Sequence, residues 1–123
     1  MCEHTFVSVK GRPYQWFKSA LARGDLAGVR AAAAELPHID LADALAICLL
    51  MGQQDDARFE RAATKWLARL ALERPSIGLD ELGQALLAME VLPDNPGAAK
   101  ATLAGICRAH GLQDAVRLLA PRR

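Results

Sequence analysis

Residues 41–51 read LADALAICLLM, and Asp43 is the only charged residue among them. A helix that is apolar on every face has to be enclosed on every face. The stretch is too short to span a bilayer, which takes about 20 apolar residues, so the material around it has to be protein. These residues therefore predict the central helix of an all-α protein.

The composition favours the same fold class. Hydrophobic residues make up 52% of the 123 residues but aromatic residues only 5%, so a core has to be built largely from Leu and Ala. Those two residue types favour helices, whereas the β-branched and aromatic residues that favour strands are sparse. Fifteen basic and fourteen acidic residues leave a formal net charge of +1, so no global field attracts nucleic acid or an anionic membrane.

Capping and breaking residues divide the chain into amphipathic segments. Asp25, Asp40 and Asn95 are predicted to cap helices, while Gly24 and Gly111 are predicted to end them. The expected helices cover residues 13–23, 26–36, 40–52, 56–74, 79–92, 96–110 and 112–119. The short connections predict six or seven helices packed as antiparallel hairpins, in an irregular bundle or a short α–α solenoid. We expect an N-terminal arm over residues 1–13 and a single helical domain over residues 14–120.

The fifth of these segments has apolar residues at helical spacing. A stripe of this kind predicts that one face of the helix is buried. The residues that form it are Leu79, Leu82, Leu86 and Met89.

The cysteines indicate the redox compartment. The chain has an odd number of cysteines, so they cannot all form disulfides with one another. The three are Cys2, Cys48 and Cys107. Glu3 and His4 stand where a secretory signal peptide needs an apolar stretch. These features predict a cytoplasmic protein, in which Cys48 and Cys107 are buried, inert thiols on apolar helix faces.

Three groups of residues carry a resemblance to known proteins. They are the aromatic cluster from Tyr14 to Phe17, the Gly24–Asp25 pair, and the segment from Arg58 to Trp66. With these groups the chain resembles small Ala, Leu and Arg-rich all-helical proteins of high-GC bacteria. Its helix, Gly-turn, helix units are similar to the hairpins of tetratricopeptide-like repeats. The resemblance implies an all-α fold, and the group brings no assigned activity.

Sequence signatures of enzymes do not occur in this chain. It contains no glycine-rich phosphate loop, no nucleophile elbow and no His-Glu-x-x-His helix. The three histidines are widely spaced, and His110 fits a helix C-terminus, where a cation is favourable. Most carboxylates fall near helix starts, where capping explains them. We therefore predict no catalytic residue, cofactor or metal ligand.

A basic ridge is the clearest polar pattern. Its members step by three, four and four residues, so they share one face of the fourth helix. They are Arg58, Arg61, Lys65 and Arg69. One interpretation is a surface for an acidic partner or for phosphates, and the other is the solvated back of an amphipathic helix.

The first helix has more aromatic residues than one buried face can hold. Tyr14 and Phe17 share a stripe, whereas Trp16 lies on a different face. Either the N-terminal arm covers the second face, or that face is open to a partner. Aromatic anchors dominate the energetics of many interfaces, so all three residues are candidates for partner binding.

The predicted function is a non-catalytic protein–protein interaction module or small cytoplasmic adaptor. It binds a protein partner or a second copy of itself, and it makes no contact with a membrane. The first alternative is a nucleic-acid-associated regulator that uses the basic ridge. The second alternative is an enzyme whose site is assembled from residues distant in the sequence.

Overall fold

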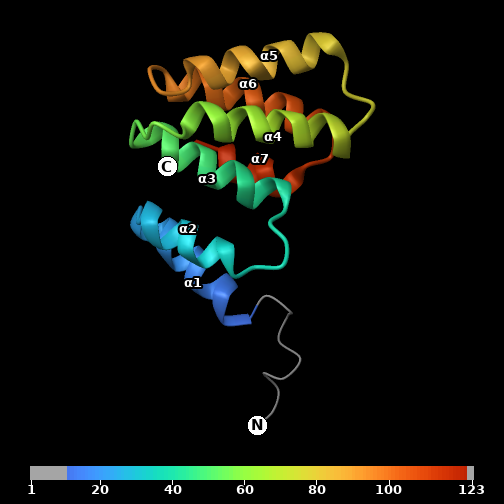
Figure 1. Ribbon diagram of the computed structural model, residues 1–123. Helices are drawn as coiled ribbons and strands as arrows, with labels where there is room; N and C mark the ends of the chain where they lie inside the picture. Colours follow the sequence, from blue (N-terminus) through green and yellow to red (C-terminus); the bar gives the residue numbers. More distant parts are fainter. Residues whose placement is uncertain (1–10, 122–123) are drawn as a thin grey trace. The chain divides into compact units, whose positions relative to one another are not determined.

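The computed structural model describes residues 11–121, in which all regular structure is α-helical (Figure 1). The elements are α1 (Gly11–Arg23), α2 (Leu26–Ala34), α3 (Leu41–Gln53), α4 (Phe59–Glu73), α5 (Leu79–Val91), α6 (Pro96–Ala109) and α7 (Gln113–Leu119). The all-α class and the helical hairpins are confirmed. Because α1 begins at Gly11, residues 11–13 belong to the helix, and the rest of the expected arm lies outside the described residues.

Local capping sets most of the helix starts. The side chains of Asp25, Asp40 and Asn95 each accept a hydrogen bond from the backbone N–H three residues on, at 3.0, 2.9 and 3.3 Å. Each bond satisfies a backbone donor that has no partner within the helix. Gly24 and Gly111 follow α1 and α6 with φ of 70° and 74°, a left-handed conformation that favours glycine. All five of these predictions are confirmed.

The chain divides into two compact units, of which the first runs to Ile39 and the second begins at Asp40. In the first unit α1 and α2 form a hairpin. The two helices approach closely at Gly28, where an added Cβ would lie 3.3 Å from the Cβ of Ala20. The buried apolar residues of this hairpin are Phe17, Ala20, Leu26, Val29 and Ala32. The expectation of one domain over residues 14–120 stays a prediction.

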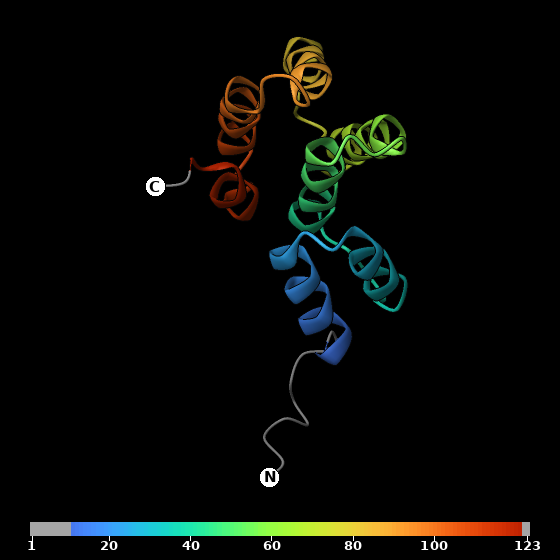
Figure 2. The same cartoon turned by 90° about the vertical axis from the view of Figure 1, so that its left-hand side faces the viewer.

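In the second unit the helices enclose one core. Each helix from α3 to α7 packs on the next, and α7 returns to pack on α3 (Figures 1 and 2). This closure makes the unit a bundle, because the ends of an open solenoid do not meet. The largest fully buried side chains of its core are Trp66, Leu45, Leu70, Met89, Leu103 and Cys107.

The apolar stretch over residues 41–51 forms most of α3. No residue in this stretch is exposed, but enclosure on every face is met only in part, because five residues are half-buried: Ala42, Ala44, Ala46, Ile47 and Leu49. Trp66 of α4 is only 1% exposed, and its indole Nε1 donates a 2.8 Å hydrogen bond to the carbonyl oxygen of Leu41. Asp43, the one charged residue of the stretch, is buried in the first turn of α3.

The buried stripe predicted for α5 is partly wrong. Met89 is buried and Leu82 is half-buried, but Leu79 and Leu86 are 88% and 48% exposed. The helix turns Ala85 and Ala88 to the core instead, so that small side chains face the neighbouring helices. Small residues let helix backbones approach closely, and this side of α5 is the one that packs on the neighbouring helices.

Within residues 11–121, no helix has the length and apolar character that crossing a bilayer requires.

Candidate functional site

The outer side of α5 is an exposed apolar surface, which we call the α5 face. Leu87 and Val91 are 61% and 41% exposed, in addition to Leu79 and Leu86. All four share the half of the helix opposite Ala85 and Ala88. Isolated apolar residues are common on protein surfaces, but a group of four large aliphatic side chains on one helix is typical of an interaction site.

Gly83 lies at the middle of the α5 face. It is an exposed helical residue, and no atom of the protein lies within 4 Å of the position that its Cβ would occupy. A glycine inside a helix destabilises it by about 0.5–1 kcal/mol relative to alanine. Packing within the chain does not require glycine at this position, so the open space over Gly83 is a feature of the surface alone.

The α5 face is also acidic. The helix contains Asp80, Glu81 and Glu90 but no Lys or Arg. Glu81 turns back to cap the helix, whereas Asp80 and Glu90 are exposed and form no ion pair with another described residue. A complementary partner therefore has to be apolar and basic.

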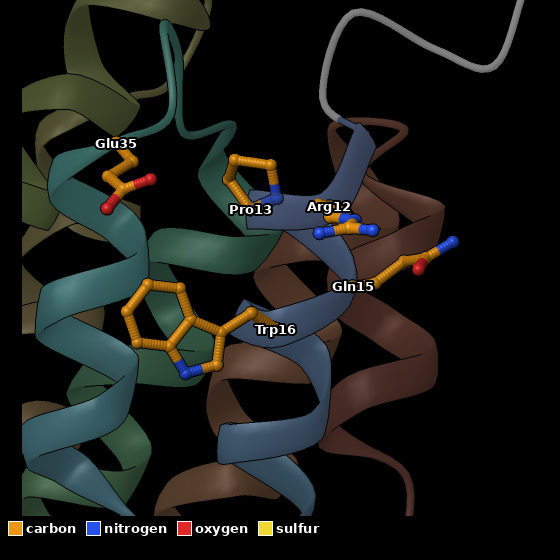
Figure 3. Close-up of a pocket in the computed structure, with 5 residues that line it drawn as sticks. All are labelled: Arg12, Pro13, Gln15, Trp16 and Glu35. Carbon is orange, nitrogen blue, oxygen red and sulfur yellow. The ribbon is translucent and has the colours of Figure 1, made fainter. Parts of the chain in front are cut away.

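A second open surface lies on the first unit. Trp16 is 40% exposed and borders a shallow depression of about 550 Å³. Figure 3 shows its indole extending from α1 toward α2, with Arg12, Pro13 and Gln15 on α1 and Glu35 at the end of α2. Together these five side chains combine an aromatic surface with one basic and one acidic group.

The three aromatic candidates of α1 do not share one surface. Phe17 is buried, and the half-buried ring of Tyr14 stacks on it with ring centroids 6.1 Å apart. The Tyr14 ring also lies 5.9 Å from the Nζ of Lys18. Only Trp16 remains open enough to act as an anchor for a partner.

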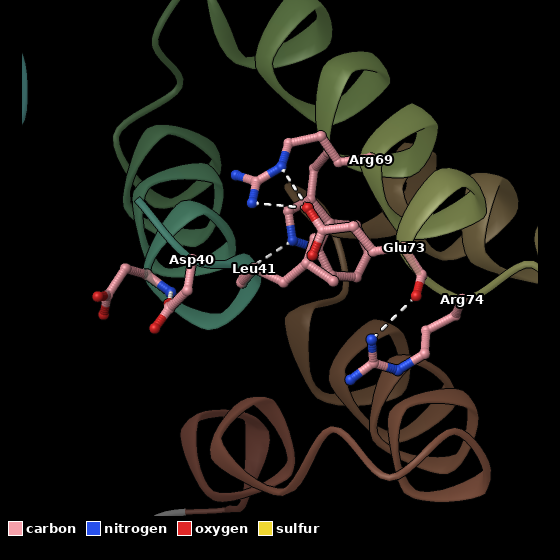
Figure 4. A network of polar contacts seen from close by, with 7 residues as sticks. Asp40, Leu41, Arg69, Glu73 and Arg74 are labelled. Carbon is pink, nitrogen blue, oxygen red and sulfur yellow. Dashed lines mark hydrogen bonds and ion pairs between the residues drawn. The ribbon is translucent and has the colours of Figure 1, made fainter. Parts of the chain in front are cut away.

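Two of the four basic groups on the α4 ridge, Arg58, Arg61, Lys65 and Arg69, are already paired. Arg58 donates two side-chain hydrogen bonds of 2.8 and 2.7 Å to Asp56, and this pairing raises its pKa. Arg69 donates two bonds of 3.0 and 2.8 Å to Glu73 (Figure 4).

Arg61 and Lys65 of the α4 ridge are exposed and form no ion pair with any residue in the described part of the chain. Only two of the four basic side chains of the ridge are therefore unpaired. Phosphate binding to a surface strengthens with the number of unpaired basic groups, so this arrangement favours the solvated-face interpretation.

A polar cluster that the sequence analysis missed joins the α4–α5 loop to the end of α6. His110 Nε2 lies 2.9 Å from Glu81 Oε1, and His110 Nδ1 lies 3.4 Å from Ser76 Oγ. The N–H of Gly78 donates a 3.1 Å bond to the same carboxylate. That bond, followed by the contact with His110, lowers the pKa of Glu81. No sequence signal connects groups that are 29 and 34 residues apart.

This cluster holds segments together, and the backbone N–H groups that follow Ser76 are not free to form an oxyanion hole. A serine nucleophile needs free N–H donors to stabilise an oxyanion. The N–H of Ile77 already donates to Arg74 O at 3.0 Å, and the N–H of Gly78 is bound to Glu81. The guanidinium of Arg74 also donates to the carbonyl oxygen of His110 at 3.1 Å, which ties the loop to the helix end.

The two described cysteines lack nucleophilic character. Both are free and buried, and burial raises the pKa of Cys48 to about 12 and that of Cys107 to about 11. A thiol of this kind stays protonated at neutral pH and does not react as a thiolate. Among residues 11–121, no three His, Cys, Asp or Glu side chains are grouped as metal ligands.

Neither a protein-family model, nor a curated protein, nor a solved structure matches this chain. The resemblance to small helical proteins of high-GC bacteria therefore stays a prediction, and so does the likeness to tetratricopeptide-like hairpins. Function has to be argued from the surfaces of the molecule.

Proposed function

We propose that this protein is a non-catalytic interaction module that binds a protein partner through the α5 face. The observation that carries the proposal is the exposure of Leu79, Leu86, Leu87 and Val91 on one side of a single helix. Cys48 and Cys107 are both free thiols, which suits a reducing compartment, and we place the module in the cytoplasm.

The chemistry of the α5 face defines the partner. Burial of one leucine side chain contributes about 1.5–3 kcal/mol, so a contact that covers several of them offsets part of the entropy lost on association. The open space over Gly83 leaves room for a bulky side chain from the partner. Asp80 and Glu90 at the same surface favour basic residues around that side chain.

A pair of leucine substitutions tests this proposal. Leu87→Gln removes an apolar contact from the α5 face, and Leu72→Gln makes the same change at an exposed leucine of α4. Both variants should keep the helical circular dichroism spectrum of the wild type. In affinity capture from the native host, with mass spectrometry of the bound proteins, we expect Leu87→Gln alone to lose the partner. Equal recovery by both variants would contradict the proposal.

Nucleic-acid binding through the α4 ridge has weaker support, because Arg58 and Arg69 are paired. Its test is the replacement of Arg61 and Lys65 by Gln, followed by titration with duplex DNA at several salt concentrations. A wild-type affinity that falls steeply with salt, and that the double variant loses, would favour this alternative. We expect the wild type to show no such binding.

A further inference from the structure

We propose that the partner of the α5 face is a second copy of this chain, which docks through the exposed side of α1. This α1 face consists of Arg12, Trp16, Ser19 and Arg23, which follow one another at helical spacing. The proposal rests on the proposed function, because it names the partner of the same surface.

Charge distinguishes the α1 face from other surfaces of the molecule. Helix α1 contains Arg12, Lys18 and Arg23 and no acidic residue, whereas α5 contains three acidic residues and no basic one. Over whole units, residues 11–39 hold four basic and two acidic groups, and residues 40–121 hold eight basic and eleven acidic groups. A basic surface of one copy is thus matched by an acidic surface of the next.

The same charges disfavour other modes of self-association. Two α5 faces cannot pair well, because Asp80 and Glu90 of one copy would meet the same carboxylates of the other. The exposed side of α4 carries Arg61 and Lys65 but also acidic residues, and its aromatic residues Phe59 and Trp66 are not exposed. Among residues 11–121, only the α1 face joins unpaired positive charge to an exposed aromatic ring.

Shape supports the same pairing. The indole of Trp16 is a large, rigid group, and the open space over Gly83 leaves room for it to lie against the α5 face. Next to Trp16, the depression lined by Pro13 offers an apolar wall to a leucine such as Leu87. Figure 3 shows Arg12 at this depression, where it can meet the carboxylate of an incoming helix.

Two charged groups of the α1 face set the orientation of docking. Arg12 forms no ion pair with any described residue, so its charge is available to Asp80 or Glu90 of the second copy. Arg23 is partly engaged, because it donates to Ser19 Oγ at 2.6 Å and lies 3.5 Å from Asp25. Glu35, at the α2 side of the depression, repels an acidic helix and directs it toward Arg12.

The pairing uses two different surfaces of each molecule. Every copy carries both an α1 face and an α5 face, so binding at one leaves the other free for a further copy. A heterologous contact of this type builds rings or open chains rather than a closed dimer. The assembly therefore grows with protein concentration and weakens with salt.

Complementing variants of the full chain test this arrangement by analytical ultracentrifugation. Trp16→Ala disables the α1 face, and Leu87→Gln disables the α5 face. We expect the wild type to form species beyond a dimer, and each variant alone to self-associate more weakly by roughly tenfold or more. An equimolar mixture of the two retains one intact pair of faces, so it should form a heterodimer and nothing larger. Leu72→Gln should behave as the wild type does.

A charge reversal provides an independent measurement. Arg12→Glu should weaken self-association, and a mixture of Arg12→Glu with Glu90→Lys should recover it, because the opposite charges then meet across the interface. Both positions are exposed, so the fold does not depend on them. This pair keeps the proposal testable if Trp16→Ala fails to fold.

Three results would overturn the proposal. They are a wild type that stays monomeric at all accessible concentrations, variants that associate as strongly as the wild type, and a mixture of variants that forms no heterodimer. If the wild type is monomeric but Leu87→Gln loses a captured foreign protein, self-docking is wrong and the proposed function stands. If Leu87→Gln changes neither self-association nor capture, both are wrong.

Discussion

The indole of Trp66 donates a 2.8 Å hydrogen bond to the carbonyl oxygen of Leu41. These residues are 25 positions apart, and the bond joins the middle of α4 to the first turn of α3. Trp66 is thus both the largest fully buried side chain and a polar link between two helices. A buried tryptophan needs a partner for its N–H, and the start of α3 provides one.

Trp66→Phe should destabilise the protein by about 2 kcal/mol or more, because it removes this hydrogen bond and leaves space that the smaller ring does not fill. Chemical denaturation followed by far-UV circular dichroism measures the change. Trp16→Phe is the matched control at an exposed position, where we expect about 0.5 kcal/mol or less. Equal losses at both positions would show that the link to Leu41 contributes little.

Leu45→Ala should lower the free energy of unfolding by about 2–5 kcal/mol, since Leu45 is fully buried at the centre of the bundle and truncation leaves a cavity. Leu49, which is only half-buried, should show a smaller loss when replaced by Ala. Leu72→Ala on the exposed side of α4 serves as the control. A loss below about 1 kcal/mol for Leu45→Ala would contradict the central position of α3.

Gly83→Ala should act in opposite directions on stability and on binding. Alanine stabilises the helix by about 0.5–1 kcal/mol, while its methyl group occupies space that we assign to a partner. Gly105 is likewise exposed on α6 with open space around it, so Gly105→Ala should stabilise the fold and leave association unchanged. Thermal melts and sedimentation together separate the two effects.

The Glu81 carboxylate should make stability depend on pH in the acid range. Its pKa in the folded protein is lowered by the Gly78 N–H and by His110. The stabilisation is therefore present above the ordinary Glu value and lost as the pH falls through the lowered one. Glu81→Gln should flatten this part of the stability profile, whereas Glu90→Gln, which removes an exposed carboxylate, should leave it in place. Identical profiles for all three proteins would exclude a contribution from this cluster.

The buried thiols should react only when the protein unfolds. In a Cys2→Ser background, Ellman's reagent at neutral pH should modify Cys48 and Cys107 slowly in the folded protein and rapidly in denaturant. Because folding raises their pKa values from 9.0 to about 12 and about 11, the unfolded chain ionises first, and stability should fall as the pH rises above the unfolded value. Rapid modification under native conditions would mean that these thiols are accessible.

Features that depend on local interactions could be predicted from the amino-acid sequence. Asp25, Asp40 and Asn95 could be recognised as caps because each bonds a backbone group three residues away. The absence of exposed residues over 41–51 followed from composition, since a helix without a polar face has no side to present to water. The exposure of Trp16 was one of two alternatives that the crowding of aromatic residues on α1 left open.

Which way each helix faces, and which distant groups meet, depends on how the helices pack on one another. Helix α5 is rotated about its axis so that Ala85 and Ala88 face the neighbouring helices. In this orientation Leu79 and Leu86 lie on the surface. The contact of His110 with Glu81 exists only because the bundle brings a loop to a helix end. The spacing of apolar residues shows which of them share one side of a helix, but not which side packs on the neighbouring helices. The α5 face therefore could not be predicted from sequence.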